Sequence, residues 1–185
     1  YYQRRGDADV GLLITEGTTV GRGGASNDPR VPNFHAEQAL KGWQNVVEAT
    51  HETPAKIGPQ LWHVGMMRQP GTGPEPDAAS DSPSGRTHTG SQVQPEPTES
   101  EVADMVMAYA NAAGDAARLG FDCVEIHGAH GYLIDEFFWG VMNTRADQYG
   151  GGLVERAKFA GEVIAECRAQ VGEDMPIILR WSQWK

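Results

Sequence analysis

The stretch FDCVEIHGAHGYLID, residues 121–135, decides the fold, because an apolar run gives way there to histidine, glycine and tyrosine. Residues 121–128 are predicted to form a strand of a buried parallel sheet. Side chains alternate along a strand, so Glu125 and His127 share one face and the apolar residues beside them share the other. The apolar face would pack on helices, which leaves Glu125 and His127 facing the opposite side of the sheet.

Strand and helix patterns alternate on both sides of this stretch. Short apolar runs rich in β-branched residues indicate strands, and apolar residues at helical spacing indicate helices. This alternation predicts parallel strands joined by right-handed crossovers in an α/β fold. The expected strands are 10–16, 56–62, 121–128 and 176–181, and the expected helices are 36–52, 98–119 and 153–171.

Both an open doubly wound sheet and a (β/α)8 barrel fit this alternation. The barrel, a TIM barrel, is favoured because polar side chains end successive strands, as functional residues do in that fold. Gln60 and Trp62 end one strand, and Arg180 ends the last. His127 and His130 belong to the strand between them. No glycine-rich phosphate turn follows the first strand, which counts against a dinucleotide-binding sheet.

The mouth of this barrel would gather many hydrogen-bond donors, one large ring and the fixed positive charge of Arg180. Such a mouth suits a flat, polar, electron-accepting heterocycle. Residues 66–98 are rich in Pro, Gly, Ser and Asp, and a loop of this length is usually functional or disordered. We expect it to be an active-site loop.

The amino-acid composition argues against some classes of binding partner. The 185 residues carry a formal net charge of −10, which argues against nucleic acid or an anionic membrane. No apolar run approaches the ~18 residues of a membrane span. Cys123 and Cys167 are isolated and are expected to be small buried residues in a reducing cytoplasm. We expect a cytoplasmic protein that acts on a small molecule, and a homo-oligomer stays open.

Four segments resemble one known family. Residues 125–135 are similar to the active-site segment of the Old Yellow Enzyme family, whose pattern is His, Gly or Ser, Ala, His or Asn, Gly and Tyr. Residues 143–151, NTRADQYGG, with Arg156 after them, resemble the second signature of that family. Residues 60–65 and 13–17 also match, in the correct order, so the resemblance covers nearly the whole chain.

The resemblance implies an FMN-dependent oxidoreductase. In such enzymes FMN lies across the barrel mouth, takes hydride from NADH or NADPH and passes it to the β-carbon of an activated alkene, such as an enone or a nitro compound. His127 and His130 would be catalytic and substrate-binding, donating hydrogen bonds to the substrate oxygen where negative charge develops. Tyr132 would protonate the α-carbon from the opposite face.

The resemblance also implies the cofactor contacts. Gln60 would bond the flavin pyrimidine edge, and Arg180 would sit near N1 and C2=O, where a cation stabilises the anionic reduced form. Gly17 would let its backbone approach the flavin closely. Trp62 would shape the substrate pocket. These positions carry the expected site.

The family pattern implies a single incomplete barrel domain over residues 1–185, about strands two to five of eight. One strand is expected before this chain and three after it, the latter holding the FMN phosphate. After Gly151 the usual helix cap is replaced by Gly152, and Trp181 replaces the usual Leu.

Bland interpretations and two alternatives stay open. In a purely structural interpretation, Arg180 would pair with Glu125. Arg145, Asp147 and Arg156 would tie the loop before the 153–171 helix to that helix. The chain could be an inert fragment of such an enzyme, unable to bind FMN alone.

The second alternative is a metal-dependent barrel hydrolase. His127 and His130 would be ligands, and His63 or Asp135 would supply the third one that a site needs. The family resemblance favours a site without metal.

Overall fold

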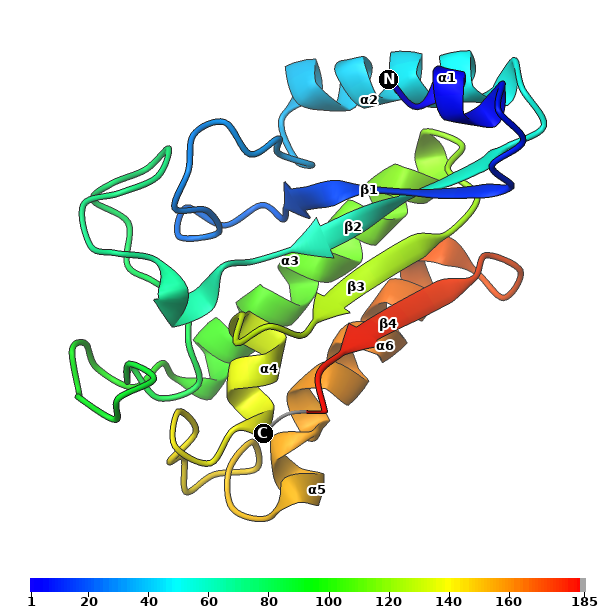
Figure 1. The fold of residues 1–185 in the computed structure, drawn as a ribbon. Helices are drawn as coiled ribbons and strands as arrows, with labels where there is room; N and C mark the ends of the chain where they lie inside the picture. Colours follow the sequence, from blue (N-terminus) through cyan, green and yellow to red (C-terminus); the bar gives the residue numbers. More distant parts are fainter. Residues whose placement is uncertain (184–185) are drawn as a thin grey trace.

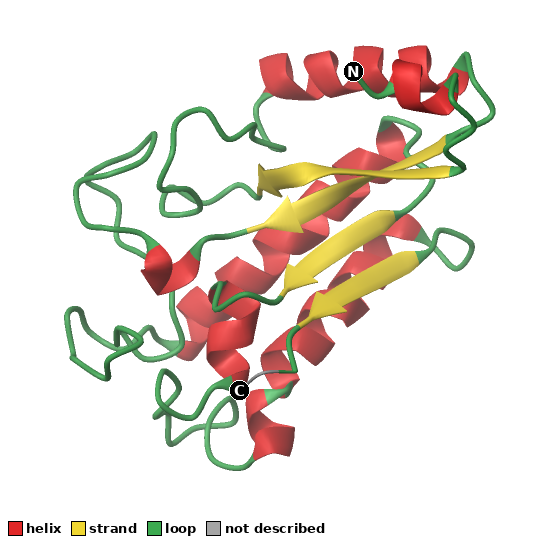
Figure 2. Cartoon of the chain, viewed as in Figure 1, coloured by secondary structure: helices red, strands yellow, loops and turns green. Residues whose placement is uncertain are grey.

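The computed structural model describes residues 1–183 as a four-stranded parallel sheet with helices packed behind it (Figure 1). Helices α3 and α6 lie behind the sheet, and the long loops gather at the arrowhead ends of the strands (Figure 2). The strands are β1 (Leu12–Thr19), β2 (Lys56–Trp62), β3 (Val124–Gly128) and β4 (Ile177–Trp181). The helices are α1 (Gln3–Gly6), α2 (Glu37–His51), α3 (Glu99–Arg118), α4 (Leu133–Phe138), α5 (Leu153–Arg156) and α6 (Lys158–Val171), with a 3-10 turn η1 (Gly65–Met67).

The strand order β1-β2-β3-β4 follows the chain, and every neighbouring pair is parallel. A doubly wound sheet would reverse direction at a switch point, whereas a barrel adds each strand on the same side. The register sets Gly17 opposite Gln60, Gln60 opposite Glu125, and His127 opposite Arg180. Gly17, Gln60 and Glu125 therefore lie at one level of the sheet, and His127 and Arg180 pair two residues further along their strands.

The predicted alternation along β3 is confirmed. Val124 and Ile126 are fully buried in the core formed with the helices, whereas Glu125 and His127 face the other side. The helix behind them begins where the sequence indicates, because Thr98 and Glu101 cap α3 reciprocally through side chain and backbone. Gly120 follows that helix with φ of +84°, a conformation that glycine adopts without strain.

Some element boundaries differ from expectation. β1 extends to Thr19, beyond the expected end, because pairing with β2 resumes after a register shift between Ile14 and Gly17. The predicted 153–171 helix divides at Ala157 into α5 and α6, and Gly152 caps α5 without a side-chain bond. The short elements α1, η1 and α4 had no periodic signal long enough to find them.

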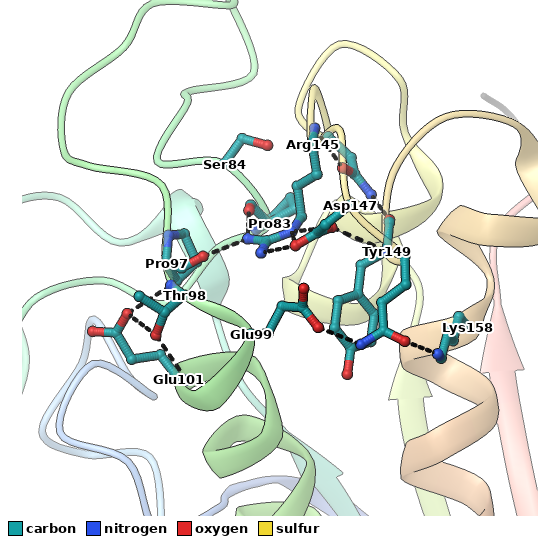
Figure 3. A network of polar contacts seen from close by, with 12 residues as sticks. Pro83, Ser84, Pro97, Thr98, Glu99, Glu101, Arg145, Asp147, Tyr149 and Lys158 are labelled. Carbon is teal, nitrogen blue, oxygen red and sulfur yellow. Dashed lines mark hydrogen bonds and ion pairs between the residues drawn. The ribbon is translucent and has the colours of Figure 1, made fainter.

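Segment 66–98 is anchored by two buried arginines. Arg68 donates to three carbonyl oxygens within the segment. The Arg145 guanidinium lies between the carbonyl oxygens of Pro83 and Pro97, at 2.8 and 2.7 Å, and the Asp147 carboxylate (Figure 3). The segment is therefore tied to the loop that precedes α5.

The structural role expected for Arg156 is confirmed, whereas Arg145 ties its loop to segment 66–98 and not to the following helix. Arg156 donates to the carbonyl oxygens of Phe138 and Gly151, which joins α5 to the chain before it. Within residues 1–183, no helix combines the length and apolar character needed to cross a membrane.

Candidate active site

A cavity of about 290 Å³ opens at the carboxyl ends of the four strands. The expected site residues all line it, although they are spread over most of the chain. Glu16 and Val31 line it as well and were not expected; Glu16 adjoins Gly17, but nothing in the sequence marks Val31. The expected lining residues are Gly17, Gln60, Trp62, His127, His130, Tyr132 and Arg180.

Two imidazoles and a phenol cluster in this cavity. The ring centroids of His127 and His130 are 5.0 Å apart, and those of His127 and Tyr132 are 5.3 Å apart. Tyr132 also packs edge-on against Trp62 at 5.2 Å. Each ring is therefore held by another, and their polar atoms share one space.

A tight turn after β3 builds this cluster. His130 and Gly131 have φ of +63° and +79°, which turns the chain back over His127 before α4 begins. The His130 N–H donates to Ser182 Oγ at 2.9 Å, and the Gly131 N–H donates to Asp135 Oδ2 at 2.8 Å. These bonds offset the cost of the left-handed backbone at His130, which is uncommon for a residue with a side chain.

The electrostatics keep one imidazole neutral. Burial, reinforced by neighbouring His130 and Arg180, lowers the pKa of His127 to about 4. At neutral pH His127 is thus an uncharged imidazole that can donate one hydrogen bond. Within residues 1–183, the buried side-chain atoms that lack a hydrogen-bond partner include His127 Nδ1 and Trp62 Nε1.

Comparison with known proteins identifies the family. A family model described as NADH:flavin oxidoreductase / NADH oxidase matches residues 1–185. The chain belongs to this family. Flavin oxidoreductase hxnT of Emericella nidulans is 37% identical over 181 residues, which cover 94% of this chain and 46% of that protein.

Solved structures agree with this assignment to the NADH:flavin oxidoreductase family. Old Yellow Enzyme from Pichia sp. AKU4542 superposes with a TM-score of 0.90 at 32% identity, covering 100% of this chain and 50% of its own. Morphinone reductase in complex with tetrahydroNAD gives 0.81 at 31% identity, covering 97% and 53%. The chain spans about half the length of these relatives. The Old Yellow Enzyme resemblance and the partial barrel are confirmed.

A flavin fits the residues that this family member presents. An ideal Cβ at Gly17 would lie 3.4 Å from both Gln60 Oε1 and Trp62 Cγ, so glycine leaves that space to a ligand. Gln60 and Arg180 add a neutral amide and a cation beside it. The alternative pairing of Arg180 is also present, because its Nε donates to Glu125 Oε1 at 3.0 Å while the residue lines the cavity.

The third ligand of the hydrolase alternative does not reach the two imidazoles. His63 follows the inward-facing Trp62, so alternation turns it away, and its Nε2 lies 2.8 Å from Asp81 Oδ2. Asp135 accepts from the Gly131 N–H. No three His, Cys, Asp or Glu side chains within residues 1–183 are grouped so that they could hold a metal ion.

Proposed function

We propose that the protein carrying this chain is an FMN-dependent oxidoreductase that moves hydride from NADH or NADPH, through the flavin, to activated alkenes. Enones and nitro compounds are the proposed substrate class. The observation that carries the proposal is the gathering of two imidazoles, one phenol, one amide and one guanidinium around a single cavity. Family membership supports the redox chemistry.

Three residues of this chain would hold the cofactor. Gln60 would bond its pyrimidine edge, Gly17 would admit it closely, and the Arg180 cation would stabilise its anionic reduced form. When bound, FMN supplies the chemistry of accepting and donating hydride. The side chain of Arg180 is 48% exposed, so a bound ring would desolvate it and strengthen this attraction.

The imidazoles and the phenol would act on the substrate. Hydride addition to the β-carbon leaves negative charge on the substrate oxygen, and N–H donors from His127 and His130 would stabilise it. The Tyr132 hydroxyl would then give its proton to the α-carbon. Edge-on packing against Trp62 limits the positions that the Tyr132 ring can take, which favours transfer to one face.

Several finer points belong to this proposal. We propose a cytoplasmic location, in keeping with the free, buried thiols of Cys123 and Cys167. We also propose a single barrel domain with segment 66–98 as its active-site loop. The homo-oligomer stays a prediction.

The test starts from the complete coding sequence. The purified protein should retain FMN, its visible band should bleach anaerobically under NADH or NADPH, and cyclohexenone should restore it. A flavin-free protein, or a band that neither nucleotide bleaches, contradicts the proposal. Residues 1–185 purified alone test the inert-fragment alternative, because that alternative requires them to retain no FMN. Stoichiometric zinc by elemental analysis would favour the hydrolase.

A further inference from the structure

A buried carboxylate lies between the two side chains proposed to hold the flavin edge. Glu125 is at the centre of β3, and its side chain is only 6% exposed. Its Oε1 accepts from Gln60 Nε2 at 2.5 Å and from Arg180 Nε at 3.0 Å. One buried atom therefore touches both residues, and Glu125 itself does not line the cavity.

We propose that Glu125 is a positioning residue that decides which atoms of Gln60 and Arg180 face the ligand. This inference rests on the proposed function. Glu125 makes the pocket selective for a heterocycle edge that carries an N–H donor beside a carbonyl acceptor.

The first step is the orientation of the Gln60 amide. A carboxylate offers only acceptor atoms, whereas an amide has a donor end and an acceptor end. The NH2 of Gln60 must therefore face Glu125. Its Oε1 faces Gly17 instead, 3.4 Å from where a Cβ would stand. A ligand that lies over Gly17 would therefore face a hydrogen-bond acceptor, the Oε1 of Gln60.

The second step is the orientation of Arg180. Its Nε is engaged by Glu125, which leaves both terminal nitrogens of the guanidinium fork to the cavity. The cavity thus presents one acceptor next to cationic donors. The complementary ligand edge has an N–H followed by a C=O, which is the pattern of an imide-like pyrimidine ring.

The third step concerns charge. Glu125 offsets part of the positive charge of Arg180 at this edge of the cavity. Its removal would leave that cation less compensated and should raise the midpoint potential of the bound flavin, because the anionic reduced form is then stabilised more.

The test compares FMN with N3-methyl-FMN, which lacks the N–H that would meet Gln60 Oε1. Dissociation constants are measured by flavin fluorescence on the protein expressed from its complete coding sequence. In the unsubstituted protein the N3-methyl form should bind at least about tenfold more weakly, the equivalent of one lost hydrogen bond. In Glu125→Gln the preference should fall to about threefold or less, because Gln60 can then turn its amide over.

Two control variants test whether the change in preference comes from Glu125 acting on Gln60. Glu16→Gln removes another carboxylate from the cavity wall and should keep the full preference. Gln60→Ala should remove the preference whether or not Glu125 is present, because Glu125 acts through that amide. The midpoint potential should rise in Glu125→Gln.

The failures are distinguishable. Full preference in a folded Glu125→Gln protein overturns the positioning role, even though FMN binds. A preference below about threefold in the unsubstituted protein overturns it too, and this measurement does not depend on a variant that folds. If the unsubstituted protein binds no FMN, both the positioning role and the proposed function fail.

Discussion

Removing the hydroxyl of Tyr132 separates its chemistry from its packing. The Tyr132 ring contacts Trp62 at 5.2 Å and His127 at 5.3 Å, and phenylalanine keeps both contacts. Stability should therefore change by about 0.5 kcal/mol or less, as for substitutions that leave packing intact. Loss of a positioned proton donor costs about 10²–10⁴-fold in rate, or about 3–5 kcal/mol of barrier.

Tyr132→Phe should slow only one of the two half-reactions. In anaerobic stopped-flow, Tyr132→Phe should be reduced by NADH or NADPH at nearly the rate of the unsubstituted protein. Its reoxidation by cyclohexenone should be slower by at least about a hundredfold. Tyr149→Phe is the matched control, because that hydroxyl donates to Glu162 at 2.8 Å and does not line the cavity. Equal slowing of both half-reactions by Tyr132→Phe would refute the proton-donor role.

Three further predictions apply to the complete protein. Replacing His127 and His130 with alanine should weaken phenol binding by about 10–100-fold, because phenolate mimics the developing negative charge; unchanged affinity in a spectral titration contradicts the oxyanion role. Arg145→Met should cost about 3–5 kcal/mol in urea unfolding, since the buried carbonyl of Pro83 and the partly buried carbonyl of Pro97 lose their donor; a loss under about 1 kcal/mol shows that the network is dispensable. Burial opposes ionisation of Asp81, but hydrogen bonds from Arg22 and a neighbouring imidazole outweigh it and hold its pKa low. Asp81→Asn should therefore cost about 2–3 kcal/mol above pH 5 and less below about pH 4, where only the unfolded chain takes up the proton; a deficit that grows on acidification has the wrong sign.

The side chains that face the cavity side of the sheet could be predicted, because the alternation of side chains along a strand depends only on the strand itself. The positions of Glu125 and His127 relative to Val124 and Ile126 follow from the period of two, and the structure has them so. Parallel strands of a barrel bring their carboxyl ends together, so residues far apart in sequence reach one cavity.

Contacts made across the sheet could not be predicted in the same way. The end of β1 depends on pairing with β2, which outweighs the local glycine content. Helix α4 is too short for a periodic signal and owes its existence to burial. His63 directly follows β2, and its partner Asp81 comes from a loop whose path cannot be predicted from local sequence.

Local sequence patterns determined the α/β alternation, the side chains on each face of the strands and the kinds of side chain at the barrel mouth. Only the tertiary structure decided that one oxygen of Glu125 would bond both Gln60 and Arg180. Alternation depends on backbone geometry that each strand carries within itself. A shared hydrogen bond depends on the register between three strands, which exists only after the strands have paired into a sheet.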